Sequence, residues 1–264
     1  MAAAKVGILH RKEIARHLEA VQPEIVELMV EPFLNGGLSR AKEIARRRPV
    51  IAHGVDASLG TDTEWPAEVY DRRAEFLGAV GAAWFGEHLS FSRVPGRNLG
   101  HLTPLPFTRE AVGVVARNAR RMQARIPCPL ILENIAYYFT LGRAEMTEAQ
   151  FVTAVLDETG CGLLLDLNNL HVNGINHGYD PRAFLDAVPV DRTVEIHLAG
   201  GRTEEGLLVD SHDSPVGDPV WALLDDVLAR CAPKAIVLER DTRIPPPAEL
   251  ARELARARRA RGAA

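Results

Sequence analysis

The chain has 264 residues, 47% of them hydrophobic and 25% charged, a composition that excludes a disordered, collagen-like or coiled-coil protein. Its 31 Lys and Arg residues against 35 Asp and Glu residues give a net charge of −4, which argues against broad nucleic-acid binding. The 3 cysteines show no C-x-x-C spacing, which argues against a disulfide framework or a zinc knuckle.

The chain shows no targeting or membrane signal. No apolar run reaches the roughly 18 residues that a membrane span needs, and the N-terminus lacks the apolar stretch of a signal peptide. We therefore expect a cytoplasmic protein with no membrane partner. The absence of linkers and repeats predicts a single domain over residues 1–250. Residues 251–264, rich in Arg, are interpreted as a basic C-terminal tail that forms a solvated helix end.

Short β-branched or Leu-rich runs recur along the chain, and such near-continuous apolar runs are typical of strands covered on both faces. The predicted strands are residues 5–9, 24–30, 50–55, 83–89, 130–134, 162–167, 194–198 and 235–239. Their alternation with helical segments predicts the α/β class and a (β/α)8 TIM barrel, with a doubly wound open sheet as the alternative. Residues 207–209 are assigned to the loop after the seventh strand, because eight strands already close a barrel.

The sequence predicts the N-terminus of three helices. Thr147 and Gln150 form a T-x-x-Q capping box ahead of apolar residues at helical spacing. Asp180 and Asp218 each stand before a proline, a pattern that predicts an aspartate N-cap with proline at the first helical position.

Metal-ligand residue types end six successive predicted strands, the third to the eighth, or follow directly in the next loop. In a TIM barrel these strand ends form the functional face, and burying such groups together requires a compensating cation. Carboxylates can bridge two cations, and imidazoles favour iron over magnesium or calcium, so the set predicts two or three metal ions. The candidate ligands are His53, His88, Glu133, Asp166, His197, Asp210, His212 and Glu239.

One pair of candidates lies in a loop. Asp210 and His212 flank Ser211, and in an extended segment this spacing points both side chains the same way.

Several strings resemble those of one known family. They are HGV at 53–55, GEHLS at 86–90, LEN at 132–134, GCGLLLDLNN at 160–169, EIHLAG at 195–200 and DSHxxPV at 210–216. Together they resemble the multinuclear non-heme iron-dependent oxidative enzyme (MNIO) family, whose members are xylose-isomerase-like TIM barrels. The match runs from about residue 53 to residue 241.

The resemblance implies a function as well as a fold. It places the eight candidate ligands on the family's iron positions and implies two or three mixed-valent Fe(II)/Fe(III) ions, with dioxygen as co-substrate. The implied activity is that of an oxidoreductase of natural product biosynthesis, which modifies a residue, often Cys, in a ribosomally synthesised precursor peptide. A small partner protein that recognises the leader peptide is implied too.

Further polar residues lie in or near these strings. Asn134, Asn168, Asn169, His177 and Glu195 are predicted to orient ligands or to approach the substrate, and ordinary structural hydrogen bonding is the alternative for each. Asn169 takes a place where the related DNA-repair endonuclease barrels carry a His, a departure that favours iron over the zinc site of that group.

Two other functions remain open at this point. One is a divalent-metal sugar isomerase, epimerase or phosphodiesterase-type enzyme on the same barrel, and the other is a metal-binding regulatory or storage protein. The first is weakened by the lysines, because none of Lys5, Lys12, Lys42 and Lys234 ends a predicted strand, which removes a lysine-assisted mechanism.

Overall fold

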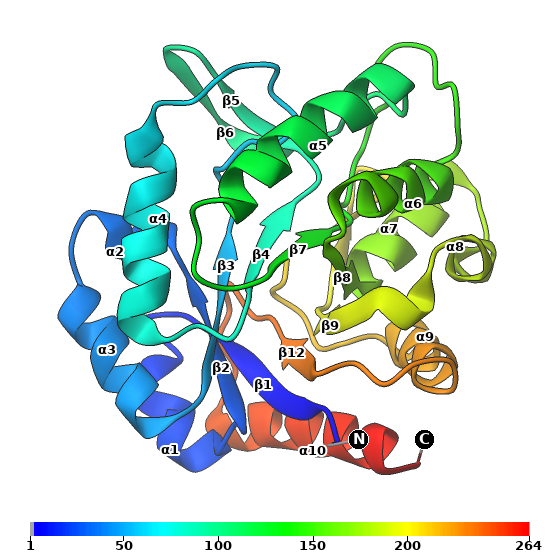
Figure 1. Ribbon diagram of the computed structural model, residues 1–264. Coiled ribbons are helices and arrows are strands. Elements are labelled where there is room, and N and C mark those ends of the chain that lie inside the picture. The colour runs from blue at the N-terminus through cyan, green and yellow to red at the C-terminus, as the bar shows by residue number, and fades with distance from the viewer. Residues whose placement is uncertain (1–2, 264) are drawn as a thin grey trace. The chain divides into compact units, whose positions relative to one another are not determined.

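A closed barrel of eight strands forms the centre of the computed structural model, which describes residues 3–263 (Figure 1). The strand order around the barrel is β1-β12-β9-β8-β7-β4-β3-β2, and the predicted TIM barrel is therefore confirmed. The barrel strands are β1 (Lys5–His10), β2 (Ile25–Met29), β3 (Val50–Gly54), β4 (Phe85–His88), β7 (Leu130–Glu133), β8 (Gly162–Asp166), β9 (Thr193–Leu198) and β12 (Ala235–Leu238).

Helices follow the strands along the chain. They are η1 (Ala15–His17), α1 (Leu18–Val21), α2 (Glu31–Leu34), α3 (Leu38–Arg47), α4 (Ala67–Val80), α5 (Arg109–Gln123), α6 (Glu148–Thr159), α7 (Leu167–His177), α8 (Pro181–Ala187), η2 (Val190–Arg192), α9 (Asp218–Leu228) and α10 (Pro247–Ala263). Among the described residues, no helix is long and apolar enough to cross a membrane.

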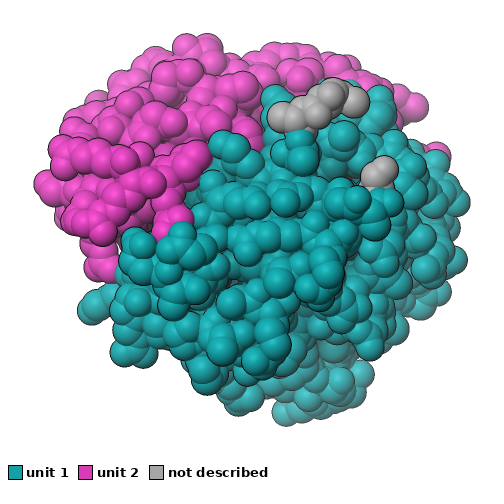
Figure 2. Space-filling model, turned by 90° about the horizontal axis from the view of Figure 1, so that it is seen from below, with its two compact units in different colours: residues 1–27, 164–264 teal, residues 28–163 magenta. Residues whose placement is uncertain are grey.

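The chain divides into two compact units, coloured separately in Figure 2. Unit 1 comprises residues 1–27 and 164–264, and unit 2 comprises residues 28–163. In unit 1, β12 pairs in parallel with both β1 and β9, and in unit 2, β4 pairs in parallel with both β3 and β7. The strands consist of near-continuous apolar runs, as expected for strands covered on both faces, and side chains such as Ile8 and Phe85 are 0% exposed.

Two hairpins lie outside the barrel. One consists of β5 (Phe91–Val94) and β6 (Arg97–Thr103), and the other of β10 (Arg202–Glu204) and β11 (Leu207–Val209). The assignment of residues 207–209 outside the barrel is confirmed, but they form a strand instead of an irregular loop. Asn176 of α7 holds β11 through two hydrogen bonds with the backbone of Leu208, at 2.8 and 2.9 Å.

The predicted helix starts are confirmed at two of three places. Thr147 and Gln150 form a complete capping box at α6, and the Asp180 side chain caps α8 ahead of Pro181. The prediction for α9 is wrong, because Gly217 is the N-cap and Asp218 is already the first helical residue. A carboxylate in the first turn still interacts favourably with the helix dipole, which explains the misleading pattern.

The basic segment at the C-terminus is part of a packed helix. In α10, which lies beside β1 in Figure 1, Leu250, Leu254 and Ala257 are at most 2% exposed. Arg261 donates to the Ala4 carbonyl at 2.6 Å. The prediction of a solvated helix end is therefore wrong for residues 251–263, and Ala264 lies outside the described residues. The single domain over residues 1–250 stays a prediction.

Candidate metal centre

Three candidate ligands come together in unit 2. The strand register places His88 of β4 directly opposite Glu133 of β7, and His53 stands at the end of β3. His53 Nε2 and His88 Nε2 each lie 3.1 Å from Glu133 Oε2, and the two nitrogens are 3.4 Å apart. All three side chains are buried.

This spacing fits a shared cation. Two ligand atoms bound about 2.1 Å from one ion, at octahedral or tetrahedral angles, lie about 3.0 to 3.4 Å apart. The His88 ring is also oriented for this role, because its Nδ1 lies 2.9 Å from the Gly54 carbonyl oxygen. A hydrogen bond from Nδ1–H to that oxygen leaves Nε2 as the nitrogen that faces Glu133 and the ion.

Unit 1 holds a second cluster, built around His197 of β9. His197 Nδ1 lies 3.4 Å from Glu239 Oε2 and 3.9 Å from Asp166 Oδ2. His212 extends the cluster, with its Nδ1 3.5 Å from Glu239 Oε2 and its Nε2 2.7 Å from Asp210 Oδ1. Five predicted ligands are thus brought together in this unit by β8, β9, the end of β12 and the loop after β11.

The electrostatics of this cluster favour a positive charge. Burial would lower the pKa of His212, but the negative charges of Asp210 and Glu239, with hydrogen bonds that the imidazole donates to Asp210 and Asp241, raise that pKa well above the ordinary value of 6.5. The same carboxylates would stabilise a bound cation. In both clusters the donors are imidazoles and carboxylates, a set that suits first-row transition metals, zinc and iron among them, and excludes a soft thiolate site.

The loop pair does not have the predicted conformation. Asp210 and His212 do contact each other, but the segment is not extended, since His212 has a left-handed backbone with φ of 48°. Asp213 stabilises the turn, because its carboxylate accepts hydrogen bonds from Ser211 Oγ at 2.6 Å and Ser214 Oγ at 2.9 Å and pairs with Arg202 of β10.

The other polar residues have varied places. Asn168 Nδ2 donates to Asp210 Oδ1 at 2.5 Å, so this amide orients a candidate ligand. The Asn169 backbone N–H donates to Asp166 Oδ1, which makes Asp166 the N-cap of α7 and leaves Oδ2 toward His197. Glu195 Oε1 lies 3.5 Å from His197 Nε2. His177 is the last residue of α7, half-buried, and belongs to neither cluster as described.

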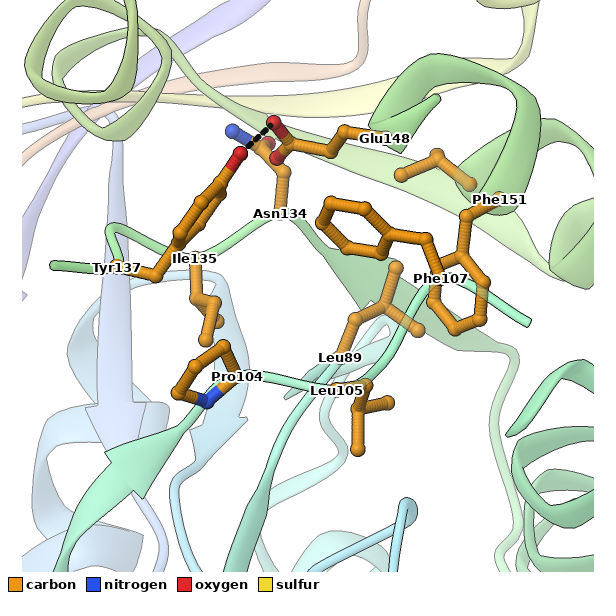
Figure 3. A pocket seen from close by; sticks show the side chains of 10 residues that line it. Leu89, Pro104, Leu105, Phe107, Asn134, Ile135, Tyr137, Glu148 and Phe151 are labelled. Carbon is orange, nitrogen blue, oxygen red and sulfur yellow. Dashed lines mark hydrogen bonds between the residues drawn. The ribbon is translucent and has the colours of Figure 1, made fainter. Parts of the chain in front are cut away.

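Asn134 lines a small pocket beside the unit 2 cluster (Figure 3). The pocket encloses about 20 Å³, room for roughly one water molecule. Tyr137 points its hydroxyl across the pocket and donates to Glu148 Oε2 at 3.1 Å. Burial and then the charge of Glu148 raise the pKa of Tyr137, so its phenol stays neutral. The remaining lining is apolar: Leu89, Pro104, Leu105, Phe107, Ile135, Phe151 and Val152.

Two buried carboxylates were missed by the sequence analysis. Glu27, in the middle of β2, is 0% exposed and places Oε2 3.2 Å from His197 Nε2. Glu87, before His88, accepts from the backbone N–H groups of His88 at 3.0 Å and Ala57 at 3.3 Å. The available signal was a charged residue inside an apolar strand, which requires a buried partner.

Comparison with solved structures shows similarity of fold. A D-psicose 3-epimerase from Clostridium cellulolyticum, solved with D-tagatose, has 12% identity and a TM-score of 0.60, covering 98% of both chains. Endonuclease IV from Thermus thermophilus has 17% identity and a TM-score of 0.59, covering 98% of this chain and 100% of its own. Such identities show the barrel alone.

Comparison with sequences shows the family. A UPF0276 protein of Caulobacter vibrioides is 41% identical over 244 residues, which cover 90% of this chain and 87% of the relative. A UPF0276 protein of Shewanella amazonensis is 40% identical, covering 95% and 91%. The model of the family described as RiPP precursor modification enzyme MbnB/TglH/ChrH matches residues 5–261. The resemblance seen in the motifs is thus confirmed, and the chain belongs to the MbnB/TglH/ChrH family of RiPP precursor modification enzymes.

Proposed function

We propose that this protein is a multinuclear non-heme iron oxidoreductase that uses dioxygen to modify a residue of a ribosomally synthesised precursor peptide. The observation that carries the proposal is the pair of His and carboxylate clusters, one in each unit, on a member of a precursor-modifying family. Bound iron supplies the capacity to activate dioxygen for oxidation of the peptide. We propose cysteine as the modified residue and a small leader-recognising protein as the partner.

The two clusters are proposed to bind separate ions. His53, His88 and Glu133 are proposed to hold one ion, with the His88 ring fixed by its contact with the Gly54 carbonyl oxygen. The cluster of unit 1 is proposed to hold one or two more, through Asp166, His197, Asp210, His212 and Glu239. Burial of the donors other than Asp210 and His212 excludes competing water and strengthens their charge interactions. The likeness to an epimerase and an endonuclease is one of fold and supports neither activity.

Elemental analysis after anaerobic loading with ferrous iron tests the metal assignment. We expect at least two irons per chain in the parent and the loss of one in His53→Ala, while His101→Ala, at an exposed position of β6, keeps the parental content. Stoichiometric zinc in the parent after this loading, or unchanged iron in His53→Ala, would contradict it.

Turnover tests the oxidative activity. A short cysteine-rich peptide encoded beside the gene, mixed with the iron-loaded protein and dioxygen, is expected to change mass and to drive oxygen consumption. The matched peptide with Cys replaced by Ser is expected to do neither. Equal oxygen uptake with both peptides, or none with either, argues against cysteine oxidation.

A further inference from the structure

His197 faces different carboxylates with its two ring nitrogens. Nδ1 faces Glu239 and Asp166, at 3.4 and 3.9 Å. Nε2 faces Glu27 and Glu195, at 3.2 and 3.5 Å. His197, Glu27, Glu195 and Asp166 are all 0% exposed. A neutral imidazole binds a metal through one nitrogen and donates a hydrogen from the other, so these two sides must have different roles.

The side of Nδ1 has the wider ligand set. Glu239 Oε2, which faces Nδ1, also lies 3.5 Å from His212 Nδ1, and His212 in turn contacts Asp210. On the other side, Glu27 and Glu195 each stand in the interior of a strand, β2 and β9 respectively. An ion at Nδ1 therefore gains further donors from strand ends and the loop, whereas Nε2 meets two carboxylates from strand interiors.

We infer that Glu27 is a positioning residue that accepts the Nε2–H hydrogen bond of His197 and thereby presents Nδ1 to the ion of unit 1. Glu195 flanks the same nitrogen and assists. The inference rests on the proposed function for the presence of that ion. A carboxylate in this place fixes the tautomer and the ring orientation and raises the basicity of the metal-binding nitrogen.

A direct ligand role for Glu27 is the competing assignment, because Glu27, His197 and Glu239 offer atoms within 4.8 Å of one another. The ring geometry argues against it. Glu27 lies near Nε2 of His197, whereas Glu239 lies near Nδ1. An ion binds only one of these two nitrogens, so an ion bound to both carboxylates would be next to the wrong ring nitrogen for one of them.

The ring nitrogens can be assigned directly. We would load the protein with zinc as a diamagnetic probe and record ¹⁵N spectra of the histidine rings, with His197→Gln identifying the His197 signals. The expected result is a proton on Nε2 and metal on Nδ1. Metal on Nε2 would overturn the inference. Because zinc is the probe, this result is independent of iron binding, whose absence in the parent would contradict the proposed function alone.

Variants at Glu27 test the hydrogen bond. We expect Glu27→Leu to bind the ion at His197 about 10- to 100-fold more weakly than the parent in an anaerobic titration with ferrous iron. At saturation this variant should still hold the parental number of ions. Glu27→Gln keeps an acceptor oxygen and should stay closer to the parent, and it guards against misfolding of the Leu variant. Asp166→Ala, a ligand control, should lose an ion at every concentration. Loss of an ion in Glu27→Gln at saturation, or parental affinity in Glu27→Leu, would refute the positioning role.

Discussion

His212 shows how one residue of the cluster is held in an unfavourable conformation. Its φ of 48° is in the left-handed region, which costs a residue with a Cβ about 1 kcal/mol or more relative to glycine. The surrounding contacts impose this conformation, since Asp213 is hydrogen-bonded to Ser211 and Ser214 on either side of it. The turn brings the imidazole to Asp210 and Glu239.

Replacement of His212 separates backbone strain from metal binding. In metal-free protein, His212→Gly is expected to be more stable than His212→Ala by about 1 kcal/mol, because glycine adopts positive φ without steric cost. Urea unfolding of both variants measures the difference. His101 of strand β6 does not itself have a positive φ, so there the order should reverse and Ala should be the more stable. Equal stability of the two His212 variants would show that the turn relaxes when the imidazole is removed.

At the scale of elements, α10 is joined to the start of the chain by charged contacts as well as by its apolar stripe. Glu24, just before β2, accepts from the Val6 backbone N–H at 2.8 Å and pairs with Arg261 at 2.5 Å and Arg258 at 3.4 Å. Burial raises the pKa of Glu24, but the Arg261 hydrogen bond, the Val6 hydrogen bond and the two arginine charges outweigh it, so the pKa is lowered from 4.5.

Glu24 should make stability depend on pH. Its folded-state pKa is lowered, so its contribution is fully present above the unfolded value of 4.5 and is lost as pH falls through the lower folded value. Glu24→Gln is expected to lower the free energy of unfolding by at most about 1 kcal/mol at pH 7, since the ion pair of Glu24 with Arg261 is partly exposed. The loss should be smaller at pH 4. Urea unfolding at both pH values measures this. The exposed Glu13→Gln should change stability at neither, and a Glu24→Gln cost that grew toward pH 4 would contradict the ionised pair.

At the scale of the whole molecule, the barrel gathers acidic side chains in its interior. Glu27, Asp166 and Glu195 are 0% exposed in unit 1, and Glu239 is 4% exposed. Carboxylates buried this close together repel one another unless a cation or a proton compensates them. The folded protein is therefore expected to bind cations that the unfolded chain does not bind as tightly, which couples metal loading to stability.

Iron should stabilise the fold measurably. At a free iron concentration about 100 times the dissociation constant, one bound ion raises the free energy of unfolding by about 2.7 kcal/mol. For a domain of this size that corresponds to a melting temperature higher by roughly 5 to 10 °C. Anaerobic calorimetry with and without ferrous iron measures the shift. The Asp210→Ala/His212→Ala variant should gain less than the parent, and an equal gain would place iron binding outside the unit 1 cluster.

Much of the fold could be predicted from the sequence because its signals are local. An apolar run such as residues 163–165 forms a buried strand in any parallel sheet, and the capping box at Thr147 closes within four residues. The positions of the candidate ligands could also be predicted from the sequence, since a His or carboxylate after an apolar run stands at a strand end wherever that strand lies. Their role as iron ligands stays a prediction.

Other features were decided by tertiary structure alone. Glu27 has a functional place only because the barrel brings β2 to His197, 170 positions further along the chain. The helix at residues 247–263 looked solvated because its apolar stripe is short and rich in alanine, and its burial depends on contacts with the first strand and helix. The turn at His212 is held by local hydrogen bonds of Asp213 with Ser211 and Ser214, and the tertiary structure adds the ion pair of Asp213 with Arg202 of the β10–β11 hairpin. For Glu27 and the C-terminal helix the deciding partner is distant in sequence, so no local pattern encodes the contact.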